Sequence, residues 1–464
     1  MTVQTGAQMT NPVPGAQQYS ILIVTPDTLG ERMAGPAIRA WEIARALAAV
    51  GRVRLVSTVG ATISHPDFEV HHAGKEKLRP HAEWADVIIV QGHILRSHPW
   101  LKALDTIIVA DIYDPLHLEQ LEQGKDLPEA DRYAVALDAV EVMNDQMERA
   151  DFMLCASEKQ RDFWLGQLAA LARINPSTYD QDPSLRSLLD IAPFGVEDNP
   201  PVQTAHGIRG VVDGIGDDDK VIIWGGGIYN WFDPITLIKA VARVAESHPT
   251  LRLFFLGVKH PNPDVPQMEM ERRARELSDQ LQLTNRVVFF NETWVPYRER
   301  ANFLLDADLG ISTHLDHVET AYSFRTRILD YLWASLPIVA TDGDTFAPII
   351  RSNGLGETVP AEDVDALAAA IEGLLFDEQR LAATAERVRV YALDQTWSQM
   401  LDPLIAFCQN PRKAADRERG VISQRNQIVA DLNKRIAGIE SSSSWRSTAW
   451  LRALGSTVST LRRR

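Results

Sequence analysis

The stretch Glu319–Asp344, ETAYSFRTRILDYLWASLPIVATDGD, decides the fold of this chain. It predicts a polar loop, then a helix over Arg325–Ser335, then a buried strand over Pro337–Ala340. A short apolar strand that directly follows a helix is typical of a parallel sheet with helices on both faces. The same alternation extends through most of the chain.

The polar residues of the predicted helix indicate a ligand. Ile328 and Leu332 give this helix an apolar stripe, while Arg325, Arg327 and Asp330 lie off it. Two arginines at a helix start, together with the free backbone N–H groups there, suit a diphosphate. Asp330, one turn further, is placed to accept hydrogen bonds from a ribose. The pattern predicts a nucleotide-sugar site; the alternative is an amphipathic helix with solvated charges.

Short apolar strands recur in two sets. The first set comprises Ser20–Thr25, Arg54–Ser57, Val87–Gln91, Thr106–Ala110 and Phe152–Ala156. The second set comprises Val221–Trp224, Leu251–Leu256, Val287–Phe290, Ala307–Ser312 and Ile338–Thr341. We therefore expect an α/β protein of two doubly wound, Rossmann-like domains that face each other across a cleft. Ligands of such sheets bind beyond the carboxyl ends of the strands.

The composition adds domain boundaries to this alternation. We predict a disordered N-terminus (1–18), a first Rossmann-like domain (19–198), a Pro-, Gly- and Asp-rich linker (199–220), a second Rossmann-like domain (221–395), a crossover helix (396–410) and a basic helical tail (411–464). At 464 residues, two domains with an appendage are the default.

Charge and apolar content exclude several classes of protein. The net charge is −15, but the segment from Arg412 onward carries +8, so the body carries about −23. An acidic body argues against nucleic-acid binding. No apolar run approaches the roughly 18 residues of a membrane span, and the polar first residues do not form a signal peptide. Two cysteines, Cys155 and Cys408, indicate a reducing, cytoplasmic setting.

Glycines follow the first strand of each predicted domain. Gly35 and Pro36 start a helix, and Gly225, Gly226 and Gly227 follow the strand VIIW. Glycine lets a diphosphate approach the backbone closely. A nicotinamide dinucleotide site is excluded, because Asn230 stands where G-x-G-x-x-G needs its third glycine.

The stretch quoted first resembles the retaining GT-B glycosyltransferases called family 4, as a divergent subgroup of the kind that builds cell-surface polysaccharide or O-antigen. In that family a loop and helix read E-G-F-G-x-x-x-x-E-A-x-A-x-G-x-P. Phe324 matches the phenylalanine, Asp330 the second glutamate and Pro337 the final proline. Arg325 replaces the second glycine, and Tyr322 replaces the first glutamate.

The resemblance implies further site residues. Tyr322 has no carboxylate to bind the donor sugar, so Glu319 or Asp316 in the same loop would bind it instead. Lys259 matches the family's second basic position and would share the diphosphate charge with the two arginines, unless it is a solvated loop lysine. Trp294 would stack on the nucleobase, or else pack against its own domain.

Related enzymes place a polar residue, often histidine, after a first-domain strand near the reacting carbon. Here DIYDPLHLEQ follows the strand TIIVA, so Asp111, Asp114 and His117 are expected beside Glu319 as catalytic residues, with His93 as a second candidate. No metal or other cofactor is expected. The D-x-D spacing of Asp342-Gly343-Asp344 is interpreted as the cap of the next helix.

The tail carries two patterns. Ile422, Val429 and Ile436 repeat every seven residues, which predicts a short coiled coil over residues 417–440 that pairs between chains or folds against the body. Beyond it, Trp450, Leu454, Val458 and Leu461 share one helical face near four arginines. That pattern suits an anionic membrane surface; a disordered tail or a partner-docking helix is the alternative.

Taken with the resemblance, these features predict an enzyme that moves a sugar from a nucleotide-sugar donor to an acceptor hydroxyl. The acceptor is expected to be a glycan or lipid-linked, and the enzyme cytoplasmic, at the inner face of the membrane. Two alternatives stay open. One is a non-hydrolysing nucleotide-sugar epimerase, and the other is a non-catalytic nucleotide-sugar-binding subunit.

Overall fold

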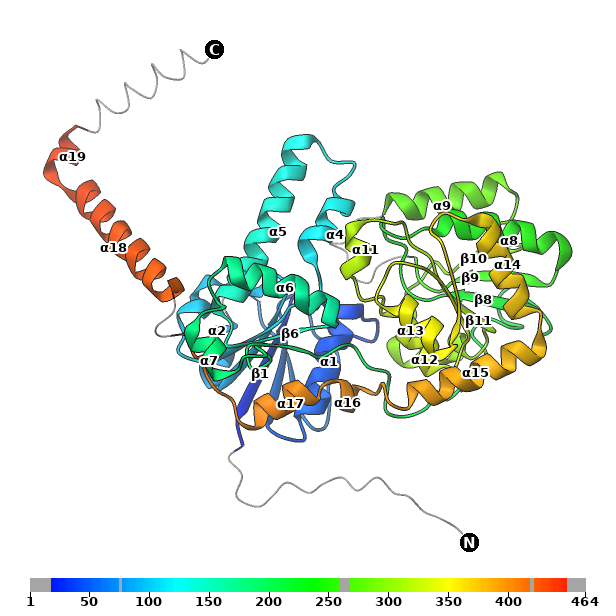
Figure 1. The fold of residues 1–464 in the computed structure, drawn as a ribbon, viewed down its shortest axis with the longest axis horizontal. Helices are drawn as coiled ribbons and strands as arrows, with labels where there is room; N and C mark the ends of the chain where they lie inside the picture. The colour runs from blue at the N-terminus through cyan, green and yellow to red at the C-terminus, as the bar shows by residue number, and fades with distance from the viewer. Residues whose placement is uncertain (1–17, 75–76, 259–267, 418–420, 449–464) are drawn as a thin grey trace, which may run out of the picture.

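The computed structural model describes residues 18–74, 77–258, 268–417 and 421–448. Two parallel sheets lie side by side, and helices cover the faces of each (Figure 1). The first sheet has the order β3-β2-β1-β4-β5-β6-β7, and the second has the order β10-β9-β8-β11-β12-β13. The predicted fold of two doubly wound domains is confirmed.

The first domain holds seven strands with helices between them. The strands are β1 (Ser20–Thr25), β2 (Arg52–Ser57), β3 (Glu69–His72), β4 (Val87–Gln91), β5 (Ile107–Asp111), β6 (Phe152–Cys155) and β7 (Leu189–Ile191). The helices are α1 (Gly35–Leu47), α2 (Arg79–Trp84), α3 (Ile94–Ser97), the 3-10 helix Pro99–Ala103, α4 (Leu116–Gln123), α5 (Glu129–Arg149), α6 (Glu158–Ala170) and α7 (Pro176–Gln181).

The second domain repeats the plan with six strands. The strands are β8 (Lys220–Trp224), β9 (Leu251–Phe255), β10 (Val288–Phe290), β11 (Leu309–Ser312), β12 (Ile338–Thr341) and β13 (Gly356–Val359). The helices are α8 (Pro234–Ser247), α9 (Glu269–Gln280), the 3-10 helix Tyr297–Glu299, α10 (Arg300–Leu304), α11 (Val318–Tyr322), α12 (Arg327–Trp333), α13 (Phe346–Asn353), α14 (Val364–Leu375) and α15 (Glu378–Ala392).

The sequence prediction missed β3, β7 and β13. Each is short, and β3 (EVHH) and β13 (GETV) are edge strands without an apolar run, so hydropathy gives no signal for them. The segment predicted as a linker also differs from expectation, because it packs onto the second domain. Ile208 is fully buried, and the carboxylate of Asp306 accepts hydrogen bonds from the backbone N–H groups of Gly207 and Ile208, both at 2.8 Å.

Helix α12 is fixed against the sheet by Tyr331. Its hydroxyl accepts from the backbone N–H of Gly225 at 2.8 Å and donates to the carbonyl of Ile311 at 2.7 Å. Gly310 makes room for the ring, since a Cβ there would lie 2.4 Å from Cγ of Tyr331. This contact holds the start of α12 beside the glycine turn that follows β8.

The chain then returns to the first domain. Helices α16 (Trp397–Met400) and α17 (Asp402–Gln409) lie along the first domain in Figure 1, and Phe407 stacks on Phe152 with ring centroids 4.4 Å apart. Thr396 forms a parallel bridge with Val196. One apolar core runs through both domains as a result, which favours a fixed relative placement.

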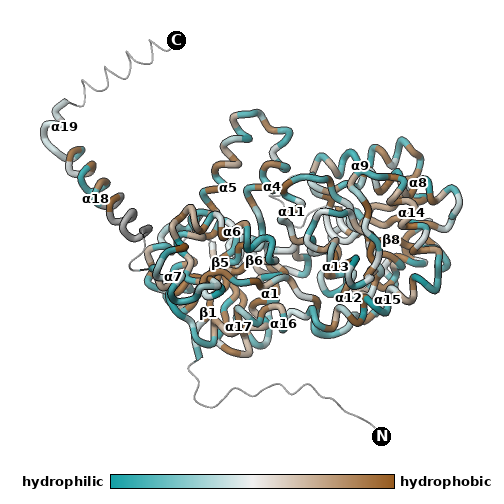
Figure 2. Tube along the Cα trace, viewed as in Figure 1, coloured by the Kyte–Doolittle hydropathy of each residue, from teal (hydrophilic) through white to brown (hydrophobic). Residues whose placement is uncertain are grey.

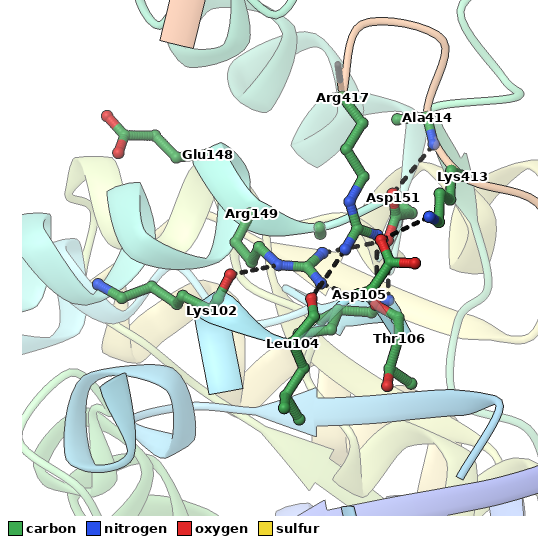
Figure 3. Close-up of polar contacts among 12 residues, drawn as sticks. Lys102, Leu104, Asp105, Thr106, Glu148, Arg149, Asp151, Lys413, Ala414 and Arg417 are labelled. Atoms are coloured by element: carbon green, nitrogen blue, oxygen red, sulfur yellow. Dashed lines mark hydrogen bonds and ion pairs between the residues drawn. The ribbon is translucent and has the colours of Figure 1, made fainter. Parts of the chain in front are cut away.

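The segment before the tail is held on the first domain by ion pairs (Figure 3). Arg417 and Arg149 both contact Asp151, at 2.5 and 3.1 Å. Lys413 contacts Asp105, and Asp416 pairs with the buried Arg173 at 2.8 Å.

Two helices follow this anchored segment, α18 (Val421–Ser441) and α19 (Ser443–Ser447). None of the helices in the described ranges is long and apolar enough to cross a membrane. The predictions for residues 1–17 and for the segment from Trp450 lie outside the described residues.

Candidate functional site

A cavity of about 760 Å³ lies between the carboxyl ends of the two sheets. Of the thirteen site residues predicted from the sequence, ten line it: Gly35, Asp111, Asp114, Gly226, Gly227, Trp294, Phe324, Arg325, Arg327 and Asp330. His117 and Glu319 do not line it, and Lys259 lies outside the described residues. Both domains contribute to the wall, as the two-sheet fold requires.

Arg327 contributes a positive charge to the second-domain wall. Its Nη2 donates to the carbonyl of Gly227 at 2.9 Å, and the guanidinium lies over the rings of Trp224 and Phe232. Its Nη1 is buried without a hydrogen-bond partner, and it forms no ion pair with a carboxylate of the described residues. Burial, helped by the nearby charge of Arg325, lowers the pKa of Arg327 to about 10. The Arg327 guanidinium thus offers a buried positive charge to an anionic ligand.

Arg325 is paired, unlike Arg327. Its Nη1 and Nη2 donate to the two carboxylate oxygens of Glu319 at 3.0 and 2.8 Å, while its Nε has no partner among the described residues. Glu319 is 1% exposed, so its predicted role as a donor-sugar contact is wrong for this arrangement. The carboxylate instead holds Arg325 in place at the cavity wall.

Tyr322, at the position of the family's first glutamate, packs against the first domain. Tyr322 stacks on Phe163 of the first domain at 4.4 Å, and its carbonyl accepts from Nε2 of Gln160 at 2.7 Å. Asp316, the other proposed substitute, is exposed in the loop before α11 and does not line the cavity. Tyr322 therefore contributes a contact between the domains.

Asp330 lies at the cavity wall and is paired with Arg300. Its Oδ1 accepts from Nε of Arg300 at 3.1 Å, and Arg300 also contacts Glu197 at 2.9 Å. The Oδ2 of Asp330 makes no hydrogen bond within the described ranges, and its side chain is 33% exposed. Burial raises the pKa of Asp330, and Arg300 opposes that effect. A carboxylate oxygen thus stays available to a ligand hydroxyl.

Glycine and tryptophan complete the second-domain wall. Gly226 has φ of +73°, a left-handed conformation that tightens the turn after β8. The Nε1 of Trp294 donates to the carbonyl of Met33 in the first domain at 3.0 Å. Because this hydrogen bond joins the indole to the first domain, the Trp294 ring is held at the cavity between α1 and β9.

On the first-domain side, the structure corrects the placement of His117. Its ring stacks on Phe163 at 5.4 Å, outside the cavity wall, and burial lowers its pKa. His93, the second candidate, does line the cavity.

The face of α4 explains this difference. Leu116, Glu119, Gln120 and Gln123 line the cavity, and they are spaced i, i+3, i+4 and i+7 as one helical face. His117 lies about 100° around the helix from Leu116. The sequence prediction missed Glu119, although this spacing is visible in DIYDPLHLEQ once a helix start at Leu116 is known.

Two carboxyl groups meet at this wall. Asp114 and Glu119 are hydrogen-bonded to each other. Burial raises the pKa of both, and the charge of Asp114 helps to raise that of Glu119 well above its ordinary value. The direction indicates that the pair holds a proton, with Glu119 donating to Asp114. Such a pair can both donate to and accept from a sugar hydroxyl.

Asp111 has a different role from the one predicted. Its carboxylate accepts from Nε and Nη2 of Arg39, both at 2.7 Å, and from Nε2 of Gln91 at 2.9 Å. Because both of its oxygens accept hydrogen bonds, Asp111 is assigned a role in positioning Arg39 and Gln91.

The interpretation of Asp344 as a helix cap is confirmed, since its Oδ1 accepts from the backbone N–H groups of Phe346 and Ala347.

Comparisons with known proteins concern the family and the fold. Residues 212–391 match the family model described as Glycosyl transferases group 1. An exopolysaccharide phosphotransferase of Streptomyces coelicolor is 29% identical over 191 residues, which are 39% of this chain and 18% of that protein. A phosphatidyl-myo-inositol mannosyltransferase of Mycolicibacterium smegmatis is 24% identical over 159 residues, 33% of this chain and 36% of that protein. The chain thus spans less than half of these relatives.

Among solved structures, the HepE protein of Anabaena in complex with UDP-glucose has a TM-score of 0.59 and 15% identity, and the match covers 84% of this chain and 98% of that one. This likeness concerns the fold, which is GT-B. The fold and the matched family together support a GT-B glycosyltransferase.

Proposed function

We propose that this protein transfers a sugar from a nucleoside-diphosphate donor to a hydroxyl of a cell-surface glycan or lipid-linked acceptor. The observation that carries the proposal is the buried guanidinium of Arg327 at the cavity, for which the described part of the chain supplies no partner to one N–H and no paired carboxylate. Burying an unpaired charge is costly, and an anionic ligand removes that cost. The name of the Streptomyces relative supports an acceptor in surface polysaccharide.

The proposed donor lies against the second domain. Its diphosphate contacts Arg327, Arg325 and the turn at Gly226 and Gly227, and its ribose hydroxyls contact Asp330. The base lies by Trp294. The two arginines supply the positive charge that stabilises the leaving diphosphate, so the proposed reaction uses no metal.

The proposed acceptor enters from the first domain, where Asp114 and Glu119 hold its hydroxyl. The hydroxyl oxygen bonds to the sugar carbon as the bond to the diphosphate breaks, and a leaving phosphate oxygen takes the hydroxyl proton. Attack on the face from which the diphosphate leaves retains the sugar configuration. Enclosure by both domains limits the competing attack by water.

A non-catalytic nucleotide-sugar-binding subunit is the second candidate. It is favoured by the position of Glu319 behind Arg325 and by Tyr322, which packs on the first domain. The two functions differ in turnover, because the subunit would bind the donor without releasing nucleoside diphosphate in any acceptor mixture.

The first test is a thermal-shift screen with UDP, GDP, dTDP, ADP and CMP and their common sugars, each with and without EDTA. One nucleotide that raises the melting temperature despite chelation supports the donor site and identifies the base. If none of them shifts the melting temperature, the assignment of Arg327 and Asp330 to a donor is contradicted.

Asp330→Ala tests the ribose contact. We expect nucleoside-diphosphate affinity to fall roughly 10- to 150-fold, since a hydrogen bond to a charged group contributes about 1.5–3 kcal/mol. Calorimetry with the nucleotide identified in the screen measures the change. Asp330→Asn is the matched variant, because it keeps the shape and should lose less. Equal affinity in the wild type and Asp330→Ala would remove Asp330 from the site.

A further inference from the structure

Helix α18 carries a stripe of apolar side chains that no described part of its own chain covers. Ile428, Leu432, Ile436 and Ile439 are between 50% and 61% exposed. The helix stands away from both domains in Figure 1, and apolar positions recur along it in Figure 2. Aligned apolar side chains on a free helix indicate an interaction surface.

The spacing of the stripe fits a second helix of the same kind. Leu432, Ile436 and Ile439 occupy heptad positions d, a and d, and the sequence continues the a positions at Val429 and Ile422. β-branched residues at a with leucine at d favour two parallel strands. We propose that α18 pairs with α18 of a second copy of this chain as a parallel two-stranded coiled coil.

The charges beside the stripe agree with this orientation. Arg435 occupies position g of one heptad, and Glu440 occupies position e of the next heptad. A parallel in-register pair places each g residue beside the partner helix's e residue five positions later, so Arg435 meets Glu440 of the second copy on both sides. Neither residue forms an ion pair within the described ranges of its own chain, although both are exposed. An antiparallel pair would separate these two charges.

The attachment of α18 decides what the pairing would join. Arg417 is fixed to Asp151 of the first domain (Figure 3), and Asp416 is fixed to Arg173, only a few residues before α18 begins. Pairing of α18 therefore links two first domains, and the stripe lies outside the cavity wall. The proposal does not depend on the proposed function.

Sedimentation of the full chain over a concentration series tests the pairing. We expect a reversible dimer in the wild type and a monomer for Ile436→Lys at every concentration. Arg435→Glu should raise the dimer dissociation constant about tenfold, because it sets two carboxylates side by side, and Arg435→Glu with Glu440→Arg should restore it. Lys434→Glu is the matched control, since it makes the same charge change at position f, away from the partner.

Oxidative crosslinking tests the orientation. Ile439→Cys should form a disulfide-linked dimer, because identical d positions meet only in a parallel in-register pair; the native Cys155 and Cys408 are fully buried. A chain that stays monomeric, or a dimer that survives Ile436→Lys, would overturn the proposal. A dimer that forms normally but does not crosslink through Ile439→Cys would overturn its parallel orientation. Unchanged melting of the two domains in Ile436→Lys would show that the body still folds.

Discussion

Replacement of Arg327 by methionine is expected to weaken nucleoside-diphosphate binding roughly 100-fold or more. The guanidinium is buried at the cavity with one N–H group unpartnered, and hydrogen bonds to a charged group contribute about 1.5–3 kcal/mol each. Methionine keeps apolar contact with Trp224 and Phe232, so the loss reports the charge. Calorimetry with the nucleoside and with its diphosphate separates the diphosphate contribution to affinity from that of the base and ribose. Only the diphosphate should lose affinity.

Folding is not expected to limit this test. A pKa lowered to about 10 means that the folded state holds the Arg327 cation less favourably than the unfolded chain does. The charge itself therefore contributes no stability at neutral pH. Arg327→Met should melt at a temperature no lower than the wild type. Arg298→Met, at an arginine of the 3-10 helix Tyr297–Glu299 that does not line the cavity, is the control. Equal diphosphate affinity in Arg327→Met and the control would contradict the donor site.

Asp114→Asn is expected to lower acceptor-dependent release of nucleoside diphosphate about 100-fold, with donor affinity unchanged. The amide keeps the shape of the side chain but loses the negative charge that holds the acceptor hydroxyl, and such positioned groups contribute roughly 10²–10⁴-fold. Glu119→Gln retains an N–H donor in place of the shared proton. It should therefore keep most of the activity and lose the alkaline decline in activity that we expect of the wild type.

The pH dependence of stability gives a second readout for this pair. Burial raises the pKa of Glu119 well above its ordinary value of 4.5, so the folded state holds a proton that the unfolded chain releases. Stability is then lost as pH rises from about 4.5 through the folded pKa. Glu119→Gln should melt higher than the wild type at pH 8 and alike at pH 4. Glu141→Gln, on the exposed part of α5, should change neither readout; if Glu119→Gln also leaves both pH profiles unchanged, the shared proton is refuted.

Several parts of this molecule were determined by the sequence alone. Buried strands such as β1 and β4 were predicted with their observed bounds, because each is a continuous apolar run between turn residues. Parallel strands place their carboxyl ends at one edge, so residues after those strands were expected at the cavity. Ten of thirteen predicted residues do line it.

The tertiary structure decided the roles within that set. Whether Glu319 faces a ligand depends on Arg325, which takes both of its oxygens, and a sequence does not state that pairing. The residue at which α4 begins decides whether His117 or Glu119 lines the cavity, since a shift of two residues turns a side chain by about 200° around the helix.

The sequence alone also did not predict the contacts between the two domains. Tyr322 and Phe163 are far apart in the chain and meet only because two sheets face each other. Composition and periodicity determine which elements form, because those signals are local. Which charges are neutralised, and which are left for a ligand, depends on contacts between distant residues, and these exist only in the folded molecule.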